Sequence, residues 1–340
     1  MAGIVRLWIK RLTGVWAAPL INLLLRLTHW QRGLCLVYHR IGVREGDPET
    51  ELVPALPLAR FDRQLRHLCR FYAVVPVEEL PAAAARRRRG GRFPVSVTFD
   101  DDVPEHVEHA LPVLRRRGVV ATFFLCGRRL DADQPRSTWW ERLQRAVDRG
   151  QEMSVVSVAL PNAATGARGE RPPDIHSLAL AMEELPPAER DVAAERLRQL
   201  AGDDPPDSGL SILGIGTLAA SGQRIGFHTR RHDPLTRLDD RALARALTDG
   251  RAELEGAAGS PVNTIAYPHG DVDARVAEAA REAGYRLGFT AARTAVTPVA
   301  DSMTLGRFDP TTMRGAEWRS HGAFALGIVR GLMTVSGQGP

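Results

Sequence analysis

Short apolar runs rich in β-branched and aromatic residues alternate along this chain with segments whose apolar residues recur at helical spacing. The apolar runs lie at residues 33–41, 73–77, 93–99, 119–125, 262–267 and 285–290. The segments with helical spacing lie at residues 61–71, 104–117, 239–256 and 272–283. Strands that alternate with helices predict an α/β fold, a parallel sheet or barrel whose strand ends meet on one rim.

The stretch from residue 93 to residue 125 predicts a complete strand–helix–strand unit. Its apolar runs flank a helix over residues 104–117, which Gly118 ends. His106 and His109 lie on that helix beside two glutamates, which indicates a solvent-facing side and no ligand role. The unit places the polar residues that follow each strand at one edge of the sheet.

Three regions interrupt or flank this alternation. Residues 131–216 contain helical segments at 139–143 and 186–200 and a Gly-, Pro- and Asn-containing stretch at 161–173, which we expect to form a mobile loop. We interpret this region as an insertion that covers one side of a cleft. Its Trp139 and Trp140 pack in the core or offer a stacking surface for a sugar. The predicted organisation is an N-terminal segment (1–32), one domain (33–310) and a C-terminal tail (311–340).

The N-terminal segment is amphipathic. Residues 4–27 are rich in Leu, Ile and Trp, but four cations interrupt them and Pro19 breaks the middle. The uncharged part, residues 12–25, is shorter than the roughly 20 residues that span a bilayer. We expect peripheral membrane contact through residues 4–27, with a helix packed on the domain as the alternative. A secretory signal would need a small-residue cleavage site, which does not follow clearly.

Composition sets limits on the function. The chain has 340 residues, 44% apolar and 25% charged, with a formal charge of +5, and this is typical of a folded globular protein. Nearly all cations are Arg, and the run Arg86 to Arg89 predicts a solvated loop. No nucleic-acid-binding module accompanies it, so we expect no nucleic-acid partner. The three cysteines are widely spaced among apolar residues, which indicates core positions and leaves His and carboxylates as metal ligands.

Candidate chemistry begins at the end of the apolar run 93–99, where the sequence reads T-F-D-D-D. Asp100 and Asp101 are predicted to lie at the carboxyl end of a buried strand, where α/β folds place their active sites. Adjacent carboxylates raise each other's pKa, so the pair is costly unless one binds a cation and the other serves as a base. A surface loop that is merely acidic is the alternative.

Histidines supply the second candidate. His228 and His232 are four residues apart, which would put both rings on one face of a helical turn and within reach of one ion. With a carboxylate from elsewhere they form a set that suits zinc or a related divalent metal. His39 follows the apolar run 33–38 and is a third candidate, although a lone histidine there is ordinarily structural.

The ordered set of motifs resembles the polysaccharide deacetylase family, which shares the NodB homology domain. The matching stretches are T-F-D-D at 98–101, A-L-P-V-L at 110–114, A-T-F-F at 121–124, H-T-x-x-H at 228–232, A-Y-P-H-G at 266–270, A-G-Y at 283–285 and F-T at 289–290. The resemblance covers residues 33–310 as a catalytic domain. It implies a distorted (β/α) barrel of the NodB type, with the helical insertion at 131–216.

The resemblance also implies roles for individual residues. Asp101, His228 and His232 correspond to the ligands of a divalent metal, with zinc expected, and Asp100 corresponds to the general base. The turn at Tyr267 and Pro268 resembles the one whose backbone N–H helps to hold the oxyanion of the substrate. His39 matches the acid of circularly permuted members, because its V-Y-H context resembles theirs.

Three positions depart from the family pattern. Asp102 stands where the family usually has Gly, which would strain the turn or add charge beside the metal. Ala266 stands where many members have an Arg that pairs with the base, and we expect Arg307 to reach Asp100 from another strand. His269 replaces a common Tyr, with little expected effect.

The resemblance implies a metal-dependent hydrolase that removes N-acetyl groups from the sugars of a polysaccharide or glycolipid precursor. Two alternatives remain open: an inactive member that binds metal and carbohydrate, and a hydrolase of another amide. A membrane-associated scaffold protein is a further alternative that rests on residues 4–27 alone. We expect the protein in the cytoplasm or peripheral at the inner membrane, with export as the alternative.

Overall fold

Seven of the described strands form one parallel sheet. The computed structural model describes residues 20–131, 136–158, 174–310 and 321–335. Six strands lie in the order β1, β5, β6, β7, β8, β9, and β4 also pairs with β5. Their bounds are Leu34–Tyr38 (β1), Ala73–Val74 (β4), Pro94–Asp100 (β5), Thr122–Leu125 (β6), Arg224–Phe227 (β7), Thr264–Ala266 (β8) and Leu287–Phe289 (β9). A separate parallel pair joins β2 (Ile41–Gly42) to β3 (Leu56–Pro57).

One extended segment connects the two ends of this sheet. Leu305 bridges to Phe289 of β9, and Phe308 bridges to Leu36 of β1, both in the parallel sense. The sheet therefore curls towards closure without a regular final strand. This is the distorted (β/α) barrel that the sequence predicts, and the fold class is confirmed.

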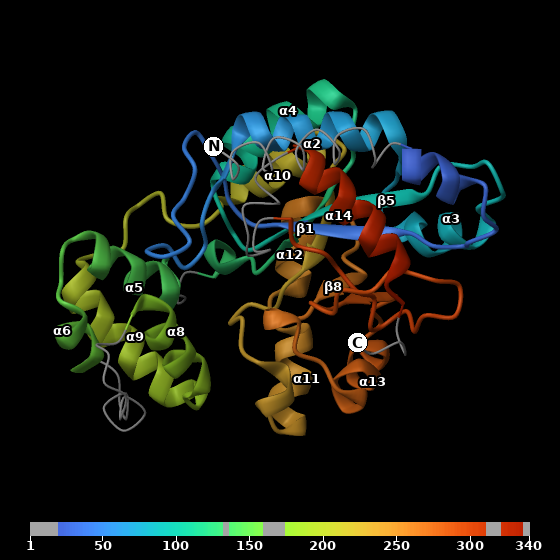
Figure 1. Cartoon of the computed structure of the whole chain (residues 1–340). Helices are drawn as coiled ribbons and strands as arrows, with labels where there is room; N and C mark the ends of the chain where they lie inside the picture. Colours follow the sequence, from blue (N-terminus) through green and yellow to red (C-terminus); the bar gives the residue numbers. More distant parts are fainter. Residues whose placement is uncertain (1–19, 132–135, 159–173, 311–320, 336–340) are drawn as a thin grey trace, which may run out of the picture.

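Helices cover the outside of the curled sheet. They are α2 (Leu58–Phe71), α3 (Leu80–Arg86), α4 (Leu111–Arg117), α10 (Ile212–Ala220), α11 (Asp240–Thr248), α12 (Arg251–Ala258), α13 (Ala274–Glu282) and α14 (His321–Met333). In Figure 1, α2, α4 and α10 lie above the sheet, and α11 and α13 lie below it. The main core between helices and sheet is built from apolar side chains such as Phe61, Leu65, Phe99, Phe123 and Phe227, all fully buried.

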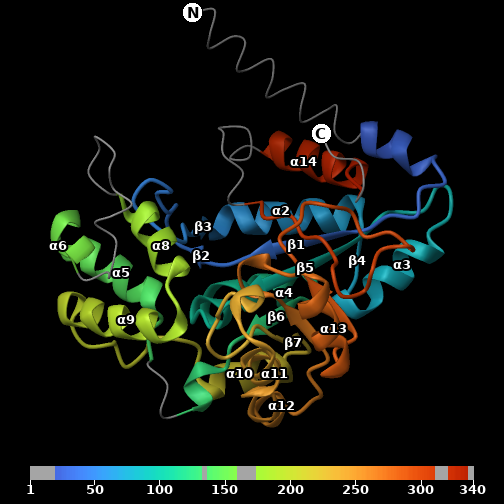
Figure 2. The same cartoon turned by 90° about the horizontal axis from the view of Figure 1, so that it is seen from below.

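A second, smaller core lies within the predicted insertion. Helices α5 (Trp139–Asp148), α6 (Met153–Val158), α8 (Ile175–Glu184) and α9 (Pro187–Ala201) bury Leu143, Ile175, Met182 and Leu197 against one another. Figures 1 and 2 both show these helices as a group beside the sheet. We call them the helical insertion. The mobile loop expected at 161–173 lies outside the described residues.

A network of charged side chains ties α5 to the segment that follows α9. Asp204 accepts hydrogen bonds from Arg142 Nε and Nη2 (2.9 and 2.7 Å), from Arg145 Nη2 (3.0 Å) and from the Ser137 amide (3.1 Å). Burial alone would raise the pKa of Asp204, but these hydrogen bonds and charges outweigh it and hold the pKa at about 2.

Two predicted elements differ in the structure. The helix expected over residues 239–256 is broken, because Asp249 is extended and Gly250 has a φ of 90°. The expected C-terminal tail contains α14, whose Phe324, Ile328 and Leu332 recur every four residues and are buried in the main core. No helix in the described ranges is both long and apolar enough to cross a bilayer.

Candidate active site

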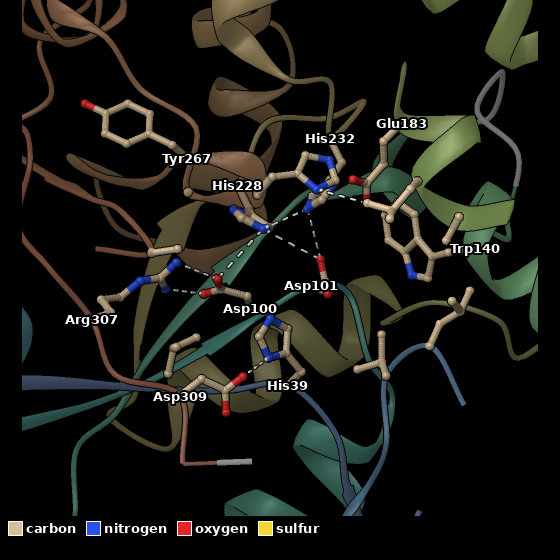
Figure 3. A pocket seen from close by; sticks show the side chains of 18 of the residues that line it. His39, Asp100, Asp101, Trp140, Glu183, His228, His232, Tyr267, Arg307 and Asp309 are labelled. Atoms are coloured by element: carbon tan, nitrogen blue, oxygen red, sulfur yellow. Dashed lines mark hydrogen bonds and ion pairs between the residues drawn. The ribbon is translucent and has the colours of Figure 1, made fainter. Parts of the chain in front are cut away.

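A cavity of about 500 Å³ opens at the carboxyl ends of the strands (Figure 3). The alternation of strands and helices predicted polar side chains at this rim, because parallel strands all end at the same edge of the sheet. The cavity walls include His39, Asp100, Asp101, Trp140, Glu183, His228, His232, Tyr267, Arg307 and Asp309. The structure therefore gathers most of the sequence-predicted candidates in one place.

Asp100, the last residue of β5, is held by Arg307. The Arg307 guanidinium donates two parallel hydrogen bonds to the carboxylate, at 2.6 and 2.7 Å, and both side chains are 4% exposed. Burial alone would raise the pKa of Asp100, but the charges of Arg307 and His228 and the Arg307 hydrogen bonds outweigh it and bring the pKa to about 2. The contact expected between Arg307 and Asp100 is thus present.

Three side chains next to Asp100 point their ligand atoms at one another. Asp101 Oδ1 lies 3.7 Å from His228 Nε2 and 3.6 Å from His232 Nε2, and the two Nε2 atoms are 3.1 Å apart. All three ligand atoms lie within 4.8 Å of one another. Asp101 Oδ1 is buried and has no hydrogen-bond partner among the described residues. One carboxylate and two imidazoles in this arrangement fit a divalent metal such as zinc.

The backbone, and not a helical turn, brings the two histidines together. Thr229 and His232 have positive φ angles of 55° and 54°, and residues 228–232 follow β7 as a loop. The prediction of a helical turn was therefore wrong, although the two rings do meet. His228 Nδ1–H donates to the Ala266 carbonyl at 2.8 Å, so its Nε2 is the unprotonated nitrogen that faces Asp101.

Asp102 contributes to the turn without the expected strain. The left-handed residue of the turn is Asp101, with a φ of 74°. The Asp102 carboxylate is buried and accepts hydrogen bonds from the backbone amides of Cys126 (2.9 Å), Gly127 (3.2 Å) and Arg128 (2.9 Å). It thereby ties the loop after β6 to the loop after β5.

His39 lies across the cavity from the metal-ligand set, below Asp100 and Asp101 in Figure 3. Its Nδ1 is 3.8 Å from Oδ2 of Asp309, a residue that the sequence analysis did not identify. Asp309 is two residues after Arg307 in the extended closing segment. Residues two apart in extended chain face the same side, and this spacing was the available signal.

Two other histidines support the loop that carries His39. His106 Nε2–H donates to the His39 carbonyl at 3.0 Å, and His109 Nδ1–H donates to the Ile41 carbonyl at 2.6 Å. The π-helical turn His106–Ala110 precedes α4 and carries both. His106 is fully buried, and burial lowers its pKa to about 4. The expectation of a solvent-facing side was wrong for His106, because its ring packs against Phe99 of β5 and Phe123 of β6.

In the turn at Tyr267 and Pro268, neither of these two residues has a free amide hydrogen, and the role of the turn in holding the oxyanion stays a prediction. The Tyr267 amide already donates to the Phe289 carbonyl at 3.0 Å, and proline has no amide hydrogen. The Tyr267 ring is buried and points away from the ligand set in Figure 3, with its hydroxyl 4.0 Å from Met303 Sδ.

The helical insertion supplies one wall of the cavity. The Trp140 ring of α5 lies 4.8 Å from the His232 ring, and on α8 the Glu183 carboxylate lies 3.4 Å from His269 Nδ1. His269 in turn stacks edge-on against His232 at 4.6 Å. Burial and the neighbouring His228 lower the pKa of His232 well below its ordinary value. The expected covering of one side of the cleft is present.

Comparison with known proteins places these features in a family. The sequence pattern of the polysaccharide deacetylases matches residues 87–190 and 214–288, more than half of the chain. A search of curated proteins finds no match.

Solved structures share the fold at low sequence identity. IcaB from Ammonifex degensii is 22% identical, with 88% of this chain and 99% of that chain covered and a TM-score of 0.53. The Streptococcus pyogenes deacetylase PplD in complex with acetate is 16% identical, with 82% and 92% covered and a TM-score of 0.53. The BpsB deacetylase domain from Bordetella bronchiseptica is 13% identical, with 82% and 96% covered and a TM-score of 0.50. By its sequence match, its fold and its site, this chain belongs to the polysaccharide deacetylase family of N-acetyl hydrolases.

Proposed function

We propose that this chain is a metal-dependent hydrolase that removes N-acetyl groups from the sugars of a polysaccharide. The observation that carries the proposal is the convergence of Asp101, His228 and His232 on one point beside the ion-paired Asp100. A base next to a divalent-metal site is the arrangement that amide hydrolysis by water requires.

The residues divide the work by position. Asp100, kept ionised by Arg307, accepts a hydrogen bond from the attacking water and takes its proton as the amide carbon is attacked. A divalent cation, with zinc as the proposed ion, when held by Asp101, His228 and His232 supplies Lewis acidity towards the acetyl carbonyl and the water.

His39 is positioned to complete the reaction. It lies on the opposite side of the cavity from the ligand set and would donate a proton to the departing sugar amine, which otherwise leaves poorly. Asp309 lies beside its Nδ1 and would fix the ring so that Nε2 faces the substrate.

The cavity wall suits a sugar ring. Trp139 and Trp140 line the cavity together with Leu52 and Leu180, and flat apolar surfaces of this kind stack against the C–H faces of sugars. We propose a polymer of N-acetylated sugars as the substrate, with a glycolipid precursor as the alternative.

Two features of the structure support turnover over an inactive member that only binds carbohydrate. Arg307 holds the base although position 266 is alanine, and Asp102 is bound by three amides. We therefore favour turnover over binding alone.

The test is acetate release from short N-acetylglucosamine oligomers, with the metal content of each protein measured in parallel. We expect the wild type to release acetate and Asp100→Asn to retain metal without turnover. His228→Ala should lose both metal and turnover. Metal binding without acetate from the wild type would contradict the proposed activity, and equal metal content in His228→Ala would contradict the ligand assignment.

A further inference from the structure

Four leucines form an exposed stripe on the helix that precedes β1. Residues 20–26 are helical, and Leu20, Leu23, Leu24 and Leu27 are 58%, 53%, 56% and 50% exposed. Their spacing of three, four and seven residues puts them on one face of the helix. We call this set the leucine stripe.

The opposite face of this helix is fixed to the protein. Asn22 is buried, and its Nδ2 donates to the carbonyl of Phe71 at the end of α2. Leu25 packs against the main core. The helix is therefore held with its leucines directed outward, and the exposure of the leucine stripe follows from this packing.

A cationic loop is attached to the same helix. Arg87 is buried, and its guanidinium donates to the carbonyls of Arg26 (2.9 Å), Thr28 (3.1 Å) and Trp30 (2.6 Å). In return, the Arg26 side chain donates to the Gly90 carbonyl at 3.2 and 2.8 Å. These bonds tie the loop to the end of the helix.

The basic neighbours of Arg87, one at the end of α3 and two in this loop, remain at the surface. Arg86, Arg88 and Arg89 are exposed. We call these three residues the basic loop. The run that the sequence analysis interpreted as a solvated loop is thus placed next to the leucine stripe by the bonds of Arg87.

We propose that the leucine stripe and the basic loop together bind the surface of an anionic lipid membrane. Outward leucines can enter the acyl boundary while adjacent arginines lie among lipid phosphates, and both are needed for stable peripheral binding. Charge complementarity favours a lipid surface over a second copy of this chain, whose matching surface would carry the same cations. In the sequence, the residues that precede the leucine stripe are also both cationic and apolar, and they include Arg6, Trp8, Lys10 and Arg11.

The position of this surface leaves the active site accessible. The helix that carries the leucine stripe is bonded through Asn22 to Phe71, two residues before β4, and Ala73 of β4 pairs with the first residue of β5. The leucine stripe therefore lies near the amino ends of the strands, whereas the cavity lies at their carboxyl ends. We expect the membrane-bound chain to act on soluble or extended polymer as readily as the free chain, and the membrane inference stands whether or not the proposed activity does.

The test is co-sedimentation of the full chain with vesicles of phosphatidylcholine, alone or mixed with phosphatidylglycerol. We expect binding to the mixed vesicles that weakens as salt is added. Each of Leu23→Gln and Leu24→Gln should lower the partition coefficient about fivefold, because a half-exposed leucine contributes about half of a full leucine burial. Arg88→Gln and Arg89→Gln should each lower it about fivefold on mixed vesicles only.

Matched controls are available elsewhere on the surface. Leu213→Gln removes a leucine that is 80% exposed on α10, and the pair Arg241→Gln and Arg286→Gln removes two exposed arginines. These variants should bind as the wild type does, and thermal melts check that all variants are folded.

Three results would overturn the inference. The first is unchanged vesicle binding in the leucine and arginine variants, and the second is equal binding to vesicles without phosphatidylglycerol. The third is loss of self-association in the leucine variants with vesicle binding intact, which would make the leucine stripe a contact between copies. Acetate release is measured with and without vesicles, so that a failure of the proposed activity is distinguished from a failure of membrane binding.

Discussion

Replacing Asp102 by the glycine that the family usually carries should weaken this protein. The Asp102 carboxylate accepts three backbone hydrogen bonds, at 2.9, 3.2 and 2.9 Å, from residues 126–128. Asp102→Gly would leave these amides without their acceptor in a buried site. The position does not need glycine, because the left-handed residue of the turn is Asp101.

The magnitude follows from the opposing contributions. Hydrogen bonds to a charged acceptor each stabilise by about 1.5 kcal/mol or more, so three amount to about 5 kcal/mol. Burial raises the pKa of Asp102, so keeping the carboxylate ionised at this site costs free energy. Removing the carboxylate also removes this cost, which offsets part of the loss of the three hydrogen bonds. We expect Asp102→Gly to lower the free energy of unfolding by about 3 kcal/mol.

Urea unfolding measures this difference, and acetate release measures its effect on activity. Asp102→Asn is the matched control, since its oxygen can still accept from Cys126 and Gly127 while its amide group faces the Arg128 N–H. We expect a loss of about 1 to 2 kcal/mol for Asp102→Asn. An Asp102→Gly variant that is as stable as the wild type and more active would refute the reasoning and show that Asp102 strains the turn.

Four further predictions concern single side chains. Arg307→Ala should cost about 3 kcal/mol of stability and lower kcat at least 100-fold, because a buried carboxylate loses its partner, with Arg307→Lys intermediate. Asp309→Asn should lower kcat about tenfold with metal content unchanged, and a parallel loss of metal would argue against its positioning of the proton donor. His106 has a folded pKa of about 4, below its ordinary 6.5, so only the unfolded chain gains its proton as pH falls between these values. The stability that the neutral His106 contributes is fully present above pH 6.5. The free energy of unfolding measured in urea should fall by about 2 kcal/mol between pH 7 and pH 5, and His106→Gln should flatten that dependence. Asp204→Asn should cost the helical insertion about 2 kcal/mol and speed hydrogen exchange in α5 and α9, while exchange in the central sheet stays slow.

The local patterns of the sequence were sufficient for the fold class and for the acidic pair and the two histidines of the site. Alternating apolar runs and helical spacing predicted the parallel strands, because each pattern reflects which side of its own element is buried. Asp100 and Asp101 were located by their place at the end of β5, and His228 and His232 by their spacing. These inferences need only neighbours along the chain.

Long-range packing decided which side chains meet at the site. Arg307 reaches Asp100, some two hundred residues away, because Leu305 pairs with β9 while Phe308 pairs with β1. No local pattern records that closure, and Asp309 enters the cavity by the same route. The backbone bond of Tyr267 likewise depends on its partner in β9, so the amide of Tyr267 itself is not free to donate to a substrate.

The surface that we propose binds a membrane shows the same division. The sequence alone showed that residues 4–27 are amphipathic and that residues 86–89 are basic. Only the tertiary structure decided that residues 20–27 of this segment and residues 86–89 lie side by side, because Arg87 bonds the end of the helix from a loop about sixty residues away. Composition and periodicity are properties of each segment, whereas proximity depends on how the core packs the segments together.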